Sequence, residues 1–505
     1  MPRLVLGIDS STTACKAIAW DPSGHPVAEG RAPIPLDNPG PAAYEQDPEQ
    51  IWDALLEATR AVTRALGPDA SCVEAVSIAH QRETFLLTDD QGAPLAPALV
   101  WMDARCVEDV ARAERDLGAP FLLETTGKYP CTTPSFYKLL GLLRRRPELR
   151  ERRPWFLDVH GFLARRLTGY FVTSVASADP LGVVSLPKRA YSEALLRYAG
   201  IAPERVARLV EPGHPVGALT AEVTRALGLP AGVPLVAGAG DGQAAGLGAG
   251  VRGERAYLNL GTALVCGRLS AAYRVDRGYR TLSGASPGTY FLEGDLKAGT
   301  FLVSWLTGTL LGAPEEERER RIQELDQKAA SLEPGAGGLV LLPYWNGVMN
   351  PYWDDQATGA VIGLRGDHGA AHLLRATMEG LAMEARLHLE GLEQAGPVGE
   401  LVVMGGGARS DLFCQIVADV TGRRVVRSGS PEATCLGAGM LAATAAGWFP
   451  TVEEATAAMA RDGETFRPGK AQERYEALYR EVYRPLYPVL APVLAALARW
   501  REDLD

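Results

Sequence analysis

Short apolar runs separated by polar turns open the chain. The runs at 4–8 and 14–20 predict two strands, and the polar segment 9–13 between them predicts the turn of a hairpin. A helix is expected next, because apolar residues recur at helical spacing over 51–66. Asp47 suits the cap of this helix and Pro48 suits its first position.

The strand-turn-strand pattern returns in the second half of the chain. A strand from Tyr257, a turn at Gly261-Thr262 and a strand over 263–269 repeat the opening hairpin. Because both halves open in the same way, the pattern predicts two lobes joined near residue 245.

Other segments extend this plan. Mixed helix and loop is expected from residue 88 to about 230, and a helix from about Ser410. A long amphipathic helix is predicted near 374–392, with its apolar face interpreted as core contacts. Further strands are predicted at 73–79, 84–87, 234–237, 289–293 and 401–404.

Composition narrows the class of protein. With 505 residues the chain suits two large domains, and its net charge of -10 does not favour nucleic acid as a partner. The basic run Arg144–Arg146 is flanked by acids and is interpreted as a solvated helix end.

The seven scattered cysteines form no CxxC pair and are expected to be small buried residues in a reducing compartment. No apolar run is long enough for a signal peptide or a bilayer span, so we expect the cytoplasm and no membrane partner.

The two predicted hairpin turns carry candidate phosphate chemistry. The turn from Asp9 to Thr13 offers hydroxyls, backbone amides and a carboxylate, with Lys16 just beyond it. Alone, this segment could equally be an ordinary polar turn. Gly261-Thr262 forms a similar turn in the second half, so two opposed hairpins could bind a polyphosphate between them. The turn Gly405-Gly406-Gly407 could let the backbone approach a nucleoside closely.

Asp241 is the candidate general base. It lies in the glycine-rich turn 238–242 after an apolar strand, where a buried carboxylate is costly unless it is functional. An aspartate in such a turn is more often structural, so position alone leaves both interpretations open.

Four other motifs bear on the function. No GxxxxGK[ST] motif occurs, which excludes the P-loop mechanism. The GxGxxG match at 248–253 leads into a predicted strand and not a helix, which argues against dinucleotide binding. The GxSxG match around Ser286 is also followed by a predicted strand, which argues against a serine hydrolase. His368 and His372 have a spacing that can bind zinc, but hydrogen bonding at a helix start is the favoured interpretation.

Several longer segments resemble the FGGY carbohydrate kinases, the family of xylulokinase, gluconokinase and glycerol kinase. The opening GIDSSTTACKA is similar to the first phosphate loop of that family. The stretch from Gly359, GAVIGL followed by HLLRATME at 372–379, fits its most specific signature. Four further family-like segments are EQDP at 45–48, LVWMDAR at 99–105, LPYWNGVMNPYWD at 342–354 and PEATCLGAGMLAA at 431–443.

The resemblance covers nearly the whole chain and implies an α/β fold of two ribonuclease-H-like lobes, the actin-like ATPase architecture, with an interlobe cleft. Residues 1–245 would form the N-terminal domain, with the substrate site and first phosphate loop. Residues 246–505 would form the C-terminal domain, which binds the nucleotide. The implied activity is ATP-dependent phosphorylation of a sugar or polyol hydroxyl, with ATP and Mg²⁺ as cofactors, and a homodimer is expected.

Carried over residue by residue, the resemblance assigns roles to these positions. Asp241 matches the catalytic base and Asp9 the magnesium-associated acid. The remaining candidates are Gln81, Arg82 and Glu83 with Asp241 for the substrate, Thr12, Thr13 and Lys16 for the first phosphate loop, Gly261 and Thr262 for the second, and Gly405 and Gly406 for the nucleotide.

The substrate is the least determined part. Gln81-Arg82-Glu83-Thr84 matches glycerol kinases, but their tyrosine has no equivalent near Thr133, and the loop around Gly261 is closer to pentulose kinases. A ketopentose such as xylulose is favoured, with glycerol or another polyol as the alternative. A non-enzymatic ATPase resembling actin or the heat-shock chaperones is the alternative from a different class.

Overall fold

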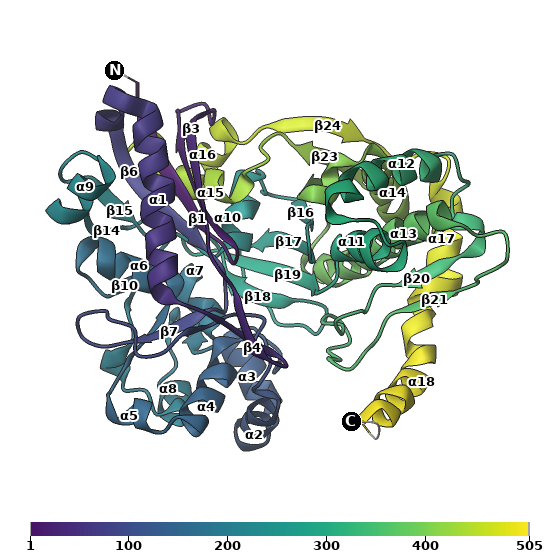
Figure 1. Cartoon of the computed structure of the whole chain (residues 1–505), viewed down its shortest axis with the longest axis horizontal. Coiled ribbons are helices and arrows are strands. Elements are labelled where there is room, and N and C mark those ends of the chain that lie inside the picture. Colours follow the sequence, from purple (N-terminus) through teal and green to yellow (C-terminus); the bar gives the residue numbers. More distant parts are fainter. Residues whose placement is uncertain (1, 503–505) are drawn as a thin grey trace.

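Two sheets of closely similar topology form the centres of two lobes that lie side by side (Figure 1). The computed structural model describes residues 2–502. In the first sheet, β1 pairs antiparallel with β2 and parallel with β6, and β2 pairs antiparallel with β3. The sheet order is β14 (Pro215–Ala218), β15 (Pro234–Val236), β6 (Val73–His80), β1 (Leu4–Ser10), β2 (Ala14–Trp20) and β3 (Pro26–Pro33).

The second sheet repeats this plan. Its first hairpin is antiparallel, its next strand pairs antiparallel with that hairpin, and two further strands add in parallel on the other side. Both sheets then end in an extra antiparallel strand, β14 or β24. The order is β18 (Arg280–Ser283), β19 (Tyr290–Leu296), β17 (Leu264–Ser270), β16 (Arg255–Leu260), β22 (Glu400–Met404), β23 (Arg424–Ser428) and β24 (Asp462–Phe466). The expected ribonuclease-H-like lobes are thereby confirmed.

The main predicted helices are present. Helix α1 (Pro48–Leu66) begins after Asp47, whose side chain accepts a hydrogen bond from Glu49 N at 2.9 Å. Helix α13 (Ala370–Leu392) contains the predicted amphipathic segment, and α14 (Asp411–Thr421) is capped by Ser410. At the start of α13, Nδ1 of His372 accepts a hydrogen bond from Gly369 N at 3.1 Å, which confirms the interpretation of this histidine.

The first lobe also contains an inserted sheet, of which the sequence predicted only the strand at 84–87. Its strands have two to four residues, too few for a clear alternating pattern. They are β4 (Asp37–Gly40), β5 (Ala43–Gln46), β8 (Ala98–Leu99), β7 (Phe85–Thr88) and β9 (Trp155–Asp158). The helices of this part are α2 (Val107–Leu117), α3 (Ala119–Thr126), α4 (Ser135–Arg145), α5 (Glu148–Glu151), α6 (Val159–Thr168), α7 (Val175–Ala178), α8 (Glu193–Ala199) and α9 (Ala221–Leu227).

The second lobe carries the remaining elements. Figure 1 shows α18 (Arg484–Glu502) leading away from this lobe to the C-terminus. The others are α11 (Phe301–Trp305), α12 (Arg318–Ala330), β20 (Val340–Leu342), β21 (Ala360–Ile362), α16 (Val452–Met459) and α17 (Gln472–Leu478). Within the described residues, no helix has both the length and the apolar character needed to cross a membrane.

Two helices join the lobes. Helix α15 (Ala433–Ala445) follows the second sheet but packs Leu436 and Met440 against Val5 and Ile18 of the first. Helix α10 (Asp241–Gly248) follows the first sheet and packs against the second, where its residue 245 contacts the core of β16, β17 and β19. The expected lobe boundary at 245 thus falls inside α10, and the first strand of the second lobe begins at Arg255.

Helices α10 and α15 approach each other backbone to backbone. A Cβ added at Gly437 would lie 1.9 Å from Ala244 O, and one added at Gly248 would lie 1.9 Å from Ala433 O. No side chain fits at either position, so glycine is required for this contact.

We therefore expect Gly437→Ala to lower the free energy of unfolding by about 1–3 kcal/mol, because the helices must separate to admit the methyl group. Urea denaturation would measure the loss. Gly366→Ala is the control, since nothing lies within 4 Å of a Cβ at that position. Equal stability of the two variants would contradict the proposed tight contact.

Candidate active site

The predicted site residues converge at the carboxyl ends of parallel strands β1, β6 and β15. Gln81 N donates a hydrogen bond to Ser10 O at 2.9 Å, and His80 N donates one to Ala239 O at 3.3 Å. Parallel strands end at one edge of a sheet, so residues far apart in sequence meet there. Asp9, the segment 80–83 and Asp241 are brought together in this way.

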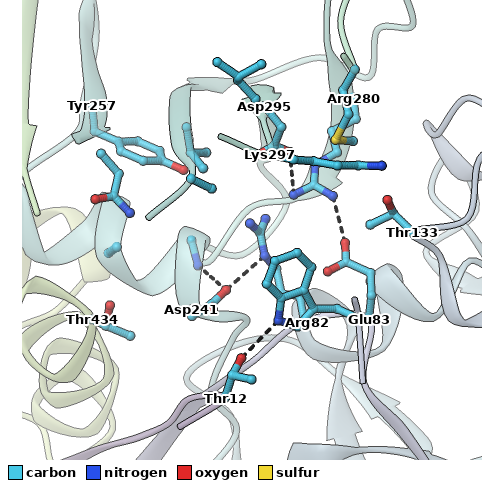
Figure 2. A pocket seen from close by; sticks show the side chains of 18 of the residues that line it. Thr12, Arg82, Glu83, Thr133, Asp241, Tyr257, Arg280, Asp295, Lys297 and Thr434 are labelled. Carbon is cyan, nitrogen blue, oxygen red and sulfur yellow. Dashed lines mark hydrogen bonds and ion pairs between the residues drawn. The ribbon is translucent and has the colours of Figure 1, made fainter. Parts of the chain in front are cut away.

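A cavity of about 260 Å³ lies at this edge, between the lobes. Figure 2 shows Asp241 beside Arg82, with the pair of Glu83 and Arg280 across from them. The residues of the first lobe that line the cavity include Asp9, Thr12, Arg82, Glu83, Trp101, Thr133 and Asp241. The second lobe contributes Tyr257, Asn259, Arg280, Asp295, Lys297, Met349 and Thr434, among others.

Asp241 is the first residue of α10, and the expected glycine turn continues directly into that helix. Its Oδ1 accepts a hydrogen bond from Gly242 N at 2.8 Å and faces Arg82 Nε at 3.0 Å. Its side chain is 38% exposed, enough for a small acceptor to reach it. Burial raises the pKa of Asp241 above its ordinary value, and Arg82 opposes this rise. A carboxylate with a raised pKa at a reachable position can act as a general base.

The two glycines beside Asp241 make room for Arg82. A Cβ at Gly240 would lie 2.5 Å from Arg82 Cγ, and one at Gly242 would lie 2.9 Å from Arg82 Cζ. These glycines are therefore needed for the close approach of Arg82.

An alternating network of charges surrounds Arg82 and Glu83. Arg82 Nη1 lies 2.8 Å from Glu293 Oε1, and Arg280 Nη1 lies 2.8 Å from Glu83 Oε1. Arg280 also pairs with Asp295 at 2.7 Å and with Glu293 at 2.5 Å. The pairs Arg82–Glu293 and Arg280–Glu83 thus connect the first lobe to β19 and β18 of the second.

The pKa values of two acids in this network are shifted in opposite directions. Burial raises the pKa of Asp295 to about 7, although Arg280 opposes the rise. Burial would also raise the pKa of Glu293, but Arg82 and Arg280 together lower it to about 2. Arg280, Glu293 and Asp295 were not predicted from the sequence. The two acids had a local signal, since they interrupt the otherwise apolar strand 290–296.

Glu83 adopts a backbone conformation that is uncommon for a residue with a side chain. Its φ is 56°, and Ser135 Oγ donates a hydrogen bond to its carbonyl at 2.8 Å. Such conformations cost energy and cluster at functional sites. Here the conformation points the Glu83 carboxylate at Arg280 and into the cavity.

Asp9 could hold a cation. Its Oδ1 is buried without a hydrogen-bond partner, and burial raises its pKa well above the ordinary value, reinforced by the charges of Asp241 and Glu432. Within residues 2–502, no group of three or more His, Cys, Asp or Glu residues could hold a metal ion. An orphaned carboxylate oxygen fits Mg²⁺, which commonly binds one or two carboxylates together with phosphates and water.

The phosphate-loop candidates are distributed around the cavity. Thr12 lines it, and its Oγ1 accepts a hydrogen bond from Trp101 Nε1 at 3.0 Å. Thr13 is exposed, and Lys16 Nζ pairs with Glu432 at 2.5 Å instead of lining the cavity.

The second hairpin and the glycine turn adjoin each other. Gly261 and Thr262 connect β16 to β17, and Asn259 just before them lines the cavity. A Cβ at Gly405 would lie 2.5 Å from Asn259 Oδ1, and the φ of Gly405 is +84°, so glycine is needed there. A Cβ at Gly406 would meet only Arg409 Nη2, at 4.0 Å.

Gln81 points away from the cavity. Its Nε2 donates to Gln46 Oε1 at 2.8 Å, and its Oε1 accepts from Thr84 Oγ1 at 3.0 Å. It is buried and holds the loop that carries Arg82 and Glu83.

The competing motifs lack the structure they need. Ser286 is buried in the loop between the antiparallel strands β18 and β19, with no helix after it. The GxGxxG match spans the end of α10 and leads into β16. Neither a hydrolase elbow nor a dinucleotide-binding turn is present at these positions.

Comparison with known proteins agrees with the geometry. The model of the FGGY family of carbohydrate kinases, N-terminal domain, matches residues 4–248, and that of the C-terminal domain matches 256–446. A glycerol kinase from Thermococcus gammatolerans is 32% identical over 95% of this chain and 96% of its own. A xylulose kinase from Streptomyces rubiginosus is 34% identical over 92% of this chain and 91% of its own.

Solved structures give the same result. The xylulose kinase from Rhodospirillum rubrum superposes with a TM-score of 0.89 at 30% identity, covering 98% of this chain and all of that one. The xylulose kinase from Brucella ovis gives a TM-score of 0.90 at 26% identity and covers 97% of this chain. The chain therefore belongs to the FGGY family of carbohydrate kinases, enzymes that transfer a phosphoryl group to a hydroxyl of a sugar or polyol.

Proposed function

We propose that this kinase phosphorylates a ketopentose such as xylulose, with ATP as donor and Asp241 as catalytic base. The observation that carries the proposal is the position of Asp241, whose carboxylate reaches the interlobe cavity between an arginine and the start of a helix. The helix N-terminus and Arg82 both favour the ionised form that a base requires.

In the proposed reaction, Asp241 takes the proton of the acceptor hydroxyl as its oxygen attacks the terminal phosphorus of ATP. The bond from that phosphorus to the bridging oxygen of ADP breaks. Thr12 and Thr13 from the first hairpin and Gly261 and Thr262 from the second would bind the phosphates. A bound Mg²⁺ would be held by Asp9 and would neutralise phosphate charge. The charge network joins both lobes at the cavity, and apposed lobes exclude water from the reaction.

The remaining candidates complete the donor and acceptor sites. Gly405 and Gly406 would let the backbone approach the nucleoside, and Lys16 would act near the phosphates only if it left Glu432. Gln81 would act by holding the loop, and Arg82 and Glu83 would bind acceptor hydroxyls.

Support for a ketopentose over glycerol comes from the second lobe. Arg280, Asp295 and Lys297 line the cavity in addition to Arg82 and Glu83. These polar groups could bind hydroxyls distant from the reacting one, which glycerol lacks. Glycerol or another polyol is the second candidate, because relatives of both names have similar identity and Arg82-Glu83 matches the glycerol kinases.

The proposal also includes the cytoplasm, where ATP is available, and the seven free thiols suit a reducing compartment. The homodimer remains a prediction that analytical ultracentrifugation can test.

We expect Asp241→Asn to lower kcat by about 10²–10⁴-fold, because the amide cannot accept the proton. Acceptor-dependent ADP release would measure it. Ser286→Ala is the control and should retain activity, since Ser286 lies in a hairpin loop outside the cavity lining. Turnover by the folded Asp241→Asn protein at the wild-type rate would exclude Asp241 as the base.

A screen of acceptors tests the substrate. ADP release is measured with xylulose, ribulose, erythritol, gluconate and glycerol, and a ketopentose should give the highest kcat/KM because it can use the polar groups of both lobes. A higher kcat/KM for glycerol would replace the ketopentose by the second candidate. ATP hydrolysis that is indifferent to every acceptor would contradict the kinase assignment itself.

A further inference from the structure

Glu293 lies behind the cavity and bonds to both guanidinium groups that line it. It is fully buried in β19. Its Oε1 accepts hydrogen bonds from Arg82 Nη1 at 2.8 Å and from Arg280 Nε at 2.9 Å. Its Oε2 accepts one from the hydroxyl of Tyr257 at 2.7 Å. A buried carboxylate with all these donors has a fixed position.

The second sheet builds this position through one row of cross-strand neighbours. Tyr257 lies opposite Gly267, Gly267 opposite Glu293, and Glu293 opposite Arg280. A Cβ at Gly267 would lie 2.5 Å from Tyr257 Cε1, so only glycine lets the tyrosine ring cross β17 and reach Glu293. The strands of the second lobe therefore set where the carboxylate lies.

Arg82 comes from the first lobe and is shared between two carboxylates. Its Nη1 engages Glu293, while its Nε engages Oδ1 of Asp241 at 3.0 Å. A Cβ at Gly242 would lie 2.9 Å from both Arg82 Nη2 and Glu293 Oε2, so the glycine admits this arrangement. Guanidinium and carboxylate groups often pair through two parallel hydrogen bonds, which would engage both oxygens of Asp241.

We propose that Glu293 is a positioning residue for the transfer reaction. From the second lobe it holds Nη1 of Arg82, so that Arg82 engages only Oδ1 of Asp241 and Oδ2 is left to accept the proton of the acceptor hydroxyl. The inference rests on the proposed role of Asp241 as base. Because Glu293 and Asp241 belong to different lobes, the base is set correctly only when the lobes are apposed.

Other charges around Asp241 stay in place when Glu293 is changed. These are Arg82 and Glu83 after β6, His80 at the end of β6, and Asp9 on β1. Removing the charge of Glu293 therefore has one main consequence for Asp241, since it frees Arg82 to pair with that carboxylate alone. A stronger pair stabilises the ionised form and makes Asp241 a weaker base.

The test is Glu293→Gln, which keeps the size of the side chain and removes its charge. The matched control is Glu379→Gln. Glu379 is also buried in the second lobe, where it accepts hydrogen bonds from Arg375 Nε at 2.8 Å and from the Tyr475 hydroxyl at 2.7 Å. It does not line the cavity. Both variants lose a buried Arg-Glu-Tyr cluster, so a merely structural role predicts the same behaviour.

The main readout is the titration of Asp241 by NMR of protein labelled with carboxyl-¹³C aspartate. The Asp241 signal is identified by its loss in Asp241→Asn. We expect its midpoint to fall by about one pH unit in Glu293→Gln, a tenfold change in proton affinity, and to stay in place in Glu379→Gln. In turnover, kcat should fall about tenfold or more, the acidic limb of its pH profile should move to lower pH, and KM for ATP should change little.

An unchanged midpoint in folded Glu293→Gln overturns the inference, as does an equal shift in Glu379→Gln. If the glutamine variant does not fold, Glu293→Asp retains the buried charge but is too short to hold Arg82, and the same shift is expected. The titration needs no acceptor, so it decides on Glu293 even if the wild-type protein turns over none of the sugars. That last result would instead contradict the proposed function.

Discussion

The packing of α10 on α15 is the constraint on which the site depends. Each helix follows the parallel strands of one sheet and packs on the other sheet, and glycines let the two backbones meet. Asp241 is the first residue of α10 and Thr434 lies at the start of α15, and both residues line the cavity. A wider separation of the two helices would move Asp241, the proposed base, away from the β16–β17 hairpin of the second lobe.

Much of this arrangement could be predicted from the chain. The two hairpins, the capped helix after Asp47 and the strands that lead to Asp241 and Gly405 all carry local signals, namely apolar periodicity, capping residues and glycine turns. The duplicated pattern also indicated two lobes. Sequence therefore supplied the elements of the fold and the residues at the ends of its strands.

The rest of the site depends on register and on long-range approach, which leave no local signal. Arg280 and Glu293 meet because β18 and β19 pair in one register, and Tyr257 joins them because Gly267 lies between. Most of the inserted sheet was missed because its strands are too short to show a period. The purpose of Gly240 and Gly242 was also hidden, since only the folded chain shows the Arg82 side chain against them.

The charge network explains why so many ionisable groups can be buried at one place. Arg82 and Arg280 each lie between carboxylates of both lobes, so neither cation is left unpaired and Glu293 is compensated from two sides. The compensation is incomplete, because burial still raises the pKa of Asp241 and of Asp295. Raised pKa values of this kind are typical of acids at functional sites, because a carboxylate that is fully compensated by nearby cations is a poor base. The network therefore joins the lobes and still leaves the pKa of Asp241 raised, as its proposed role as base requires.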